Sequence, residues 1–163
     1  MGYYRTILAA VDGSRDAQAA LRHAAMLARD QHARLIVLTV IPTPPPHVAV
    51  PGSLLAAAAS VDDIYAAILR DAVDSLPSDI GVESRLARGR PAQRILEVAH
   101  ESRCDLVVMG FHGHGRLHHA LMGSVSDSVL LGSNRPVLLM RAGGDRAAAD
   151  DGNAASPATA YAS

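Results

Sequence analysis

The sequence predicts an α/β domain built on a parallel sheet. Short apolar runs, of the kind that form buried strands, alternate with longer segments in which apolar residues recur every three or four positions, as on one face of a helix. The apolar side chains are mainly Ala, Val and Leu, with no Trp and one Phe in 163 residues, which suits thin layers of helix packed closely on a sheet. Because crossover connections are right-handed, helices are expected on both faces of this sheet.

The first strand is predicted at residues 5–11, an apolar run that stops at the turn residues Asp12 and Gly13. Ser14 is suited to N-cap the following helix, because its hydroxyl can accept a hydrogen bond from a free backbone N–H group. The predicted inward face of this helix consists of Ala17, Ala20, Leu21, Ala24, Leu27 and Ala28. A second buried strand is predicted at residues 33–41, which are rich in β-branched side chains.

Residues 42–60 interrupt this pattern. Five prolines in the segment favour turns and extended backbone over a strand paired inside a sheet. Such a long irregular connection is expected to be either mobile or a lid over a ligand. Ser60 is predicted to cap a helix that runs to Leu76. The apolar stripe of this helix is predicted to consist of Ile64, Ala67, Ile68, Ala72 and Leu76.

A further strand and helix are predicted in the second half of the chain. Residues 81–89 alternate in part between apolar and polar side chains, which favours a strand at or near an edge of the sheet. Pro91 suits the first position of a helix over residues 91–102, because its φ angle matches the helix and its missing N–H group would have no partner there. The side chains predicted to face inward from this helix are Ile95, Leu96, Val98 and Ala99.

The last predicted elements complete one domain. Strands at residues 104–110 and 135–141 flank a helix expected at about residues 124–131. Residues 142–163 are small, polar and without periodicity, so we expect a disordered tail after a single domain of residues 1–141.

Composition and charge narrow the possible functions. The formal net charge is −1 and basic residues are not interleaved with aromatic ones, so we expect no nucleic-acid partner. Apolar runs stay short of the roughly 20 residues that cross a bilayer, so we expect no membrane partner and a cytoplasmic protein. Cys104 is the single cysteine, which excludes an internal disulfide, and we expect it to be a small buried hydrophobic residue.

The fold class predicts where a ligand would bind. Open α/β sheets bind ligands beyond the carboxyl ends of their strands, where the strand order reverses. In this chain that rule selects Asp12 and Gly13, Val40, and the residues after Met109. These last residues begin the stretch GFHGHGRLHHALMGS, residues 110–124, which holds four glycines and four histidines.

Several ligands could suit this stretch. Glycines between a buried strand and a helix let backbone N–H groups approach a phosphate, and the helix N-terminus adds positive charge; a plain flexible turn is the alternative. His114 and His118 would share one face of a helix, as metal ligands can, but the stretch has no carboxylate and we expect no metal site. The sequence HGHG at 112–115 resembles the histidine motif of adenylylating enzymes superficially, but it follows a late strand rather than the first.

The chain resembles the universal stress protein family in several motifs. The spacing of Gly110, Gly113, Gly123 and Ser124 reproduces the family's nucleotide-binding motif, G-x2-G-x9-G-[ST]. The segments ILAAVDGS, GRPAQRILEVA, CDLVVMG and GSVSDSVL…RPVLLMR also resemble family segments, in the same order. The resemblance covers residues 3–141.

This resemblance implies a Rossmann-like fold, a doubly wound five-stranded parallel sheet in the order 3-2-1-4-5 with helices on both faces. It also implies a homodimer formed through the last strand, residues 136–141, and the binding of ATP, with Mg²⁺ held between the phosphates. The protein would then be a nucleotide-dependent regulator of a stress response.

The same resemblance implies roles for individual residues. Asp12 would contact the ribose or the edge of the adenine, and Met109 and Gly110 would flank the adenosine. The residues that would line the adenine pocket are Ala10 and Val40. The residues that would hold the phosphates, through backbone N–H and hydroxyl groups, are Gly113, Gly123, Ser124, Val125 and Ser126.

The chain departs from the family in its charges. Between the second and third motif glycines the family often carries several Arg or Lys, whereas this chain has Arg116 and the histidines His114, His118 and His119. We therefore expect ADP or AMP to bind nearly as well as ATP. The stretch also lacks a group that would orient a water molecule, so we expect no catalytic residue and at most a weak ATPase. The alternative is a nucleotide-free dimeric interaction module that acts through its last strand.

Overall fold

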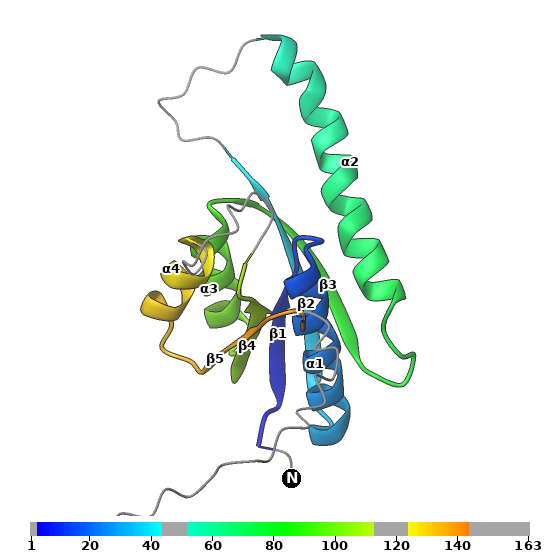
Figure 1. Cartoon of the computed structure of the whole chain (residues 1–163), viewed down its shortest axis with the longest axis vertical. Coiled ribbons are helices and arrows are strands. Elements are labelled where there is room, and N and C mark those ends of the chain that lie inside the picture. Colours follow the sequence, from blue (N-terminus) through cyan, green and yellow to red (C-terminus); the bar gives the residue numbers. More distant parts are fainter. Residues whose placement is uncertain (1–2, 44–51, 113–123, 144–163) are drawn as a thin grey trace, which may run out of the picture.

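The computed structural model describes residues 3–43, 52–112 and 124–143. Within these ranges five parallel strands form one sheet in the order β3-β2-β1-β4-β5, which confirms the predicted fold (Figure 1). In chain order the elements are β1 (Thr6–Ala10), α1 (Arg15–Gln31), β2 (Arg34–Pro42), α2 (Gly52–Asp74), β3 (Val82–Gly89), α3 (Pro91–Glu101), β4 (Leu106–Gly110), α4 (Ser124–Gly132) and β5 (Val137–Met140). The predicted tail after residue 143 lies outside the described ranges.

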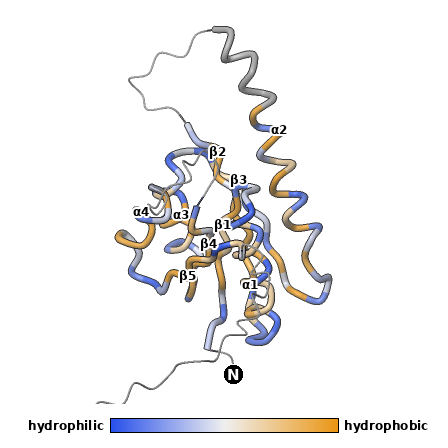
Figure 2. Tube along the Cα trace, in the orientation of Figure 1, coloured by the Kyte–Doolittle hydropathy of each residue, from blue (hydrophilic) through white to orange (hydrophobic). Residues whose placement is uncertain are grey.

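Two hydrophobic layers form because successive residues of a strand point to opposite faces of the sheet. On one face, Ile7 and Val37 pack against the alanines of α1 and against α2. On the other face, Leu8 and Ile36 pack against α3 and α4. Figure 2 shows hydrophobic residues concentrated along the strands, whereas the helices mix hydrophobic and hydrophilic positions. This arrangement is the expected doubly wound sheet with helices on both faces.

Helix α1 begins as predicted. The Ser14 hydroxyl accepts a hydrogen bond of 3.2 Å from the backbone N–H of Ala17 and so caps the helix. The buried residues of α1 are Ala17, Ala20, Leu21, Ala24, Ala25 and Ala28. Because most of these side chains are methyl groups, α1 can approach the sheet closely.

Helix α2 corrects the prediction. It begins at Gly52, and Ser60 lies inside the helix rather than at its N-cap. The alanine- and leucine-rich sequence after Pro51 has high intrinsic helix propensity, which outweighs the weak capping signal. Ile64 is 58% exposed, because the N-terminal part of α2 extends past the end of the sheet (Figure 1). The residues of α2 and its following turn that pack against the core are Leu69, Ala72, Val73 and Leu76.

The remaining elements agree with their predictions. Strand β3 lies at one edge of the sheet and β5 at the other. Pro91 occupies the first turn of α3, whose buried residues are Ile95, Val98 and Ala99. Cys104 is fully buried, as expected. Among the described residues, no helix combines the length and the hydropathy needed to cross a membrane.

Candidate nucleotide site

The carboxyl ends of β1, β2 and β4 lie side by side, because the three strands are parallel neighbours. They form the carboxyl-terminal edge of the sheet, which is not the edge formed by an outer strand such as β3 or β5. Ala10 lies beside Met109 in the register of β1 and β4. Ala10 and Met109 are 9% and 6% exposed, and both belong to the core on the α3 and α4 face. Val40, at the end of β2, and Val125, in the first turn of α4, pack against the same core. Four of the predicted site residues therefore share one face.

The turn after β1 places Asp12 and Gly13 at the same edge. The backbone N–H of Val11 donates to the carbonyl of Leu38, which extends the pairing of β1 and β2 beyond the last strand residue. Asp12 Oδ1 then accepts a hydrogen bond of 3.0 Å from the N–H of Ser14. Gly13 has a φ angle of 83°, a conformation that glycine adopts without strain. The turn thus holds the Asp12 carboxylate at the start of α1.

Gly110 ends β4 at a point where α1 passes very close. A Cβ atom on residue 110 would lie 2.7 Å from the backbone nitrogen of Ala17 and 2.9 Å from the carbonyl carbon of Asp16. Real side chains do not tolerate such contacts, and α1 would have to move. The family motif implies a ligand contact for this glycine, and the structure adds a packing reason for it.

The first turn of α4 carries the predicted phosphate-binding residues that the structure describes. Ser124 is exposed at the start of the helix, whereas Ser126 is 2% exposed. The Ser126 hydroxyl donates a hydrogen bond of 2.9 Å to the carbonyl of Phe111 and so joins α4 to the chain after β4. The backbone N–H groups of a helix's first turn have no partner within the helix and attract anions. Ser124 is the more accessible hydroxyl of the two.

Two predicted phosphate-binding residues, Gly113 and Gly123, lie outside the described residues, as do the histidines at 114, 118 and 119. Their predicted roles therefore stay predictions. Within the described ranges, no group of three or more His, Cys, Asp or Glu side chains is placed to hold a metal ion.

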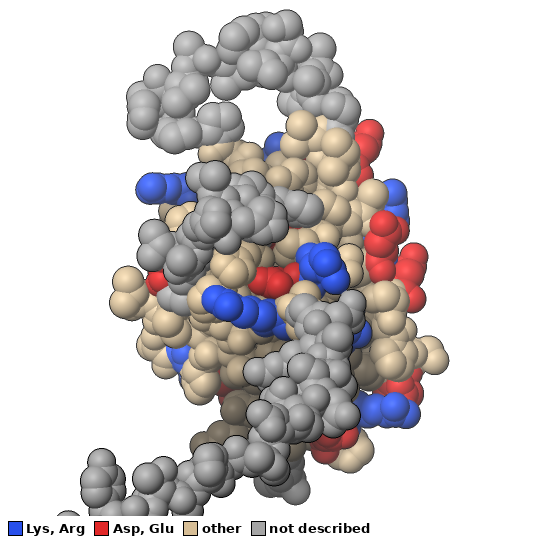
Figure 3. All heavy atoms as spheres, viewed as in Figure 1, with Lys and Arg blue, Asp and Glu red and all other residues tan. Residues whose placement is uncertain are grey.

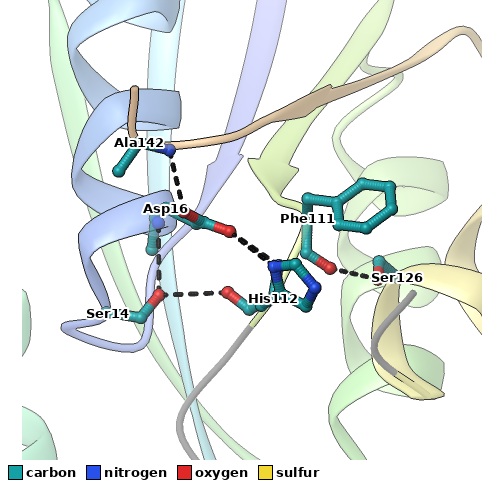
Figure 4. A network of polar contacts seen from close by, with 7 residues as sticks. Ser14, Asp16, Phe111, His112, Ser126 and Ala142 are labelled. Carbon is teal, nitrogen blue, oxygen red and sulfur yellow. Dashed lines mark hydrogen bonds and ion pairs between the residues drawn. The ribbon is translucent and has the colours of Figure 1, made fainter. Parts of the chain in front are cut away.

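Asp16 joins three segments at this edge of the sheet, and sequence reasoning did not single it out (Figure 4). Asp16 Oδ2 accepts from the backbone N–H of His112 at 3.1 Å and lies 3.0 Å from His112 Nδ1. Asp16 Oδ1 accepts from the backbone N–H of Ala142 at 2.8 Å. The Ser14 hydroxyl donates to the His112 carbonyl at 3.3 Å. His112 is 96 residues from Asp16 in the sequence, so local pattern could not reveal this contact.

The hydrogen bonds to Asp16 also determine its ionisation. Burial by itself raises the pKa of this carboxyl group. The hydrogen bonds from Ala142 and His112, together with the His112 charge, outweigh burial and hold the pKa below its usual value. An ionised carboxylate only accepts hydrogen bonds, so His112 Nδ1, 3.0 Å away, acts as the donor in this contact.

Arg141 supplies a positive charge at the same edge. Its guanidinium lies 4.1 Å from the centre of the Phe111 ring, a cation–π contact just after the end of β5. Figure 3 shows basic and acidic side chains interspersed over the visible face of the described residues rather than gathered in a patch of one sign. The sequence prediction considered charges only within residues 113–123 and missed this arginine.

A cleft of about 470 Å³ lies between α1 and α2. Its apolar lining includes Val11, Leu21 and Ile68, with Arg22 and Asp71 among its polar residues. Val11 and Leu21 belong to the core on the α1 and α2 face. The cleft is therefore on the opposite face of the sheet from Ala10 and its neighbours, although Gly13, in the turn after β1, also lines it.

Known proteins similar to this chain include members of the universal stress protein family. The sequence profile of the universal stress protein family matches residues 3–141. A universal stress protein of Thermus aquaticus, encoded in the 3′ region of a QAH/OAS sulfhydrylase, is 32% identical over 141 residues, which cover 85% of this chain and 99% of the relative.

Solved structures give the same result. UspA from Lactobacillus plantarum matches with a TM-score of 0.73 and 26% identity, over 86% of this chain and all of that one. A universal stress protein crystallised in complex with cAMP matches with a TM-score of 0.61 and 29% identity, over 86% of this chain and 98% of that one.

Proposed function

Because this chain belongs to the universal stress protein family, we propose that it binds an adenine nucleotide at the carboxyl ends of β1, β2 and β4. The observation that carries the proposal is the grouping of Ala10, Val40 and Met109 on one face, beside the first turn of α4. A related protein crystallised with cAMP supports adenine nucleotides as the class of ligand.

The proposed contacts follow the chemistry of each residue. Ala10 and Val40 line the adenine pocket, and Met109 and Gly110 flank the adenosine. The Asp12 carboxylate suits the ribose hydroxyl pair, because carboxylate oxygens accept hydrogen bonds. The proposed phosphate-binding residues are Gly113, Gly123, Ser124, Val125 and Ser126, with backbone N–H groups as the main donors.

The proposed ligand is ATP, with Mg²⁺ between the phosphates. Arg141 supplies a positive charge beside Phe111. Between the second and third motif glycines the sequence has one arginine, Arg116, where the family often carries several Arg or Lys, so ADP and AMP are proposed to bind nearly as well. The proposed role is that of a nucleotide-dependent regulator in the cytoplasm, acting through binding rather than rapid hydrolysis. A ligand that contacts the ends of β1 and β4 together can shift the population of their loops.

We further propose that the protein forms a homodimer through residues 136–141. Strand β5 is an edge strand whose four residues, all apolar, are only partly buried. The neighbouring helix α4 exposes Leu131 by 87%. Edge strands of this kind favour pairing with another chain. The same surface supports the second candidate function, a dimeric interaction module that needs no nucleotide.

Calorimetric titration separates the two functions. ATP, ADP and AMP would be titrated with Mg²⁺ into the wild type, Gly123→Val and a control, Gly81→Val, whose site has no heavy atom within 4 Å of an added Cβ. We expect wild-type binding, a loss of affinity of about 100-fold or more in Gly123→Val, and none in the control. Circular dichroism would verify that each variant folds.

The result that contradicts nucleotide binding is also clear. A folded wild type that gives no heat at millimolar nucleotide would leave the dimeric interaction module as the function. Equal affinity of wild type and Gly123→Val would exclude the glycine motif as the binding segment.

A further inference from the structure

Asp16 connects three segments that reach the candidate site. It lies in the first turn of α1, and its side chain is 15% exposed. Its two oxygens accept hydrogen bonds from residues just beyond β4 and just beyond β5, namely His112 and Ala142. One side chain of α1 therefore accepts hydrogen bonds from the residues that follow β4 and β5.

The contacts continue from these residues to α4. The backbone N–H of Phe111 donates to the carbonyl of Met140 at 2.8 Å. The Phe111 carbonyl in turn accepts the hydrogen bond from Ser126. Phe111 is thus held by β5 and α4, while the next residue, His112, is held by α1 through Asp16 and Ser14 (Figure 4). This short piece of chain therefore links the first turn of α4 to α1 and β5, in addition to the packing of Val125 against the core.

We propose that Asp16 is a positioning residue for the first turn of α4, the described part of the proposed phosphate site, and that it acts through His112 and Phe111 without touching the nucleotide. This inference rests on the proposed function. The adenine-binding part depends on Ala10, Val40 and Met109, which are held by the core on the other face of the sheet. The loss of Asp16 should therefore weaken the binding of phosphates and spare the binding of adenosine.

The chemistry of the contacts requires a carboxylate. All three groups that face Asp16 are N–H donors, two from the backbone and one from the imidazole ring. Asparagine offers one oxygen and one NH₂ group, so either orientation of its amide turns a donor toward at least one of these donors. Asp16→Asn preserves the size of the side chain and disrupts the hydrogen bonds, which makes it a suitable variant.

The first test compares ATP with adenosine. Both would be titrated calorimetrically into the wild type, Asp16→Asn and Asp30→Asn, a control at an exposed position near the end of the same helix. We expect the Kd for ATP to rise about tenfold in Asp16→Asn, with the Kd for adenosine unchanged and no effect in Asp30→Asn. A purely structural role would weaken both ligands alike, and that result would overturn the proposal, as would an unchanged Kd for ATP.

The second test does not use a nucleotide. Amide hydrogen exchange, measured by NMR, should be faster at His112 and Ala142 in Asp16→Asn than in the wild type, with the exchange of the β1 amides unchanged. Unchanged protection at His112 and Ala142 would overturn the positioning role. If the wild type binds neither ATP nor adenosine, the proposed function and this role in binding fail together. Binding of both with equal losses overturns the role of Asp16 alone.

Discussion

Two aspartates hold opposite ends of β4 by accepting backbone hydrogen bonds. Asp16 acts at the carboxyl end, where it holds His112. Asp105 precedes β4, and its Oδ2 accepts from the N–H groups of Arg5 and Thr6 at 2.8 and 2.9 Å. Burial raises the pKa of Asp105, but these two hydrogen bonds and the charges of Arg5 and Arg135 outweigh it and lower the pKa. Both carboxylates therefore stabilise the fold in their ionised form.

This ionisation predicts the acid sensitivity of the protein. A carboxyl group whose pKa is lowered by folding contributes stability that is complete above its unfolded pKa, about 3.9, and is lost as the pH falls through the folded pKa. We expect Asp105→Asn to reduce the free energy of unfolding by about 1–3 kcal/mol at pH 7 and by less at pH 3. Urea unfolding at both pH values measures this, with Asp30→Asn as the control. An equal loss at both would contradict it.

Burial also raises the pKa of Cys104, and here it outweighs the opposing charges. Its side chain is fully buried, and burial raises the pKa of the thiol to about 11, although the charges of Arg34 and Arg85 oppose the rise. The thiol is therefore neutral at physiological pH. It is a packing residue of the core on the α3 and α4 face, as the sequence predicted.

At the scale of elements, the close contact between α1 and β4 positions the site. The small side chains of α1 let its first turn lie directly against Gly110. This proximity brings Asp16 within reach of His112. A larger residue at Gly110 or Ala17 would separate α1 from β4 and break the hydrogen bonds between Asp16 and His112.

Gly110→Ala tests this contact. The added Cβ would lie 2.7 Å from the backbone nitrogen of Ala17, so α1 must shift, and we expect a loss of about 1–3 kcal/mol in the free energy of unfolding. Gly81→Ala is the matched control, because a Cβ there meets no atom within 4 Å; its effect should stay within about 0.5 kcal/mol. Urea unfolding measures both. Equal stabilities of the two variants would show that α1 adjusts freely.

At the scale of the whole molecule, the proposed dimer would form along β5. The carbonyls of Pro136 and Met140 accept hydrogen bonds from β4, at Val107 and Phe111. Since both backbone groups of a strand residue point to the same side, the N–H and carbonyl of the intervening Leu139 point away from β4, toward the side of β5 where the described residues form no further strand. An added strand would pair with them.

The proposed dimer can be tested at Leu139. Proline lacks the N–H group, so Leu139→Pro should remove an outward donor while leaving the pairing with β4 intact. Leu139→Ala loses similar packing but keeps the N–H group, which makes it the control. In sedimentation equilibrium we expect the dimer dissociation constant to rise at least tenfold more in Leu139→Pro than in Leu139→Ala. The same dissociation constant for both would exclude pairing through this edge.

The order and type of the elements were predictable from the sequence because they depend on local pattern. Apolar runs marked β1, β2 and β4, Ser14 marked the start of α1, and Pro91 marked the start of α3. The start of α2 was predicted wrongly, because a serine that can cap a helix can also lie within one. Backbone and side-chain preferences act over a few residues, and a single sequence displays them directly.

The sequence by itself also indicated which strand ends would form the proposed site, because the rule for open α/β sheets selected Asp12, Gly13, Val40 and the residues after Met109. Only the tertiary structure decided which side chains hold the chain segments that follow these strand ends. The contact of Asp16 with His112, and the reason for Gly110, arise from the packing of α1 against β4. Such contacts join residues far apart in the chain, and they depend on how closely two elements pack, a distance that no local pattern encodes.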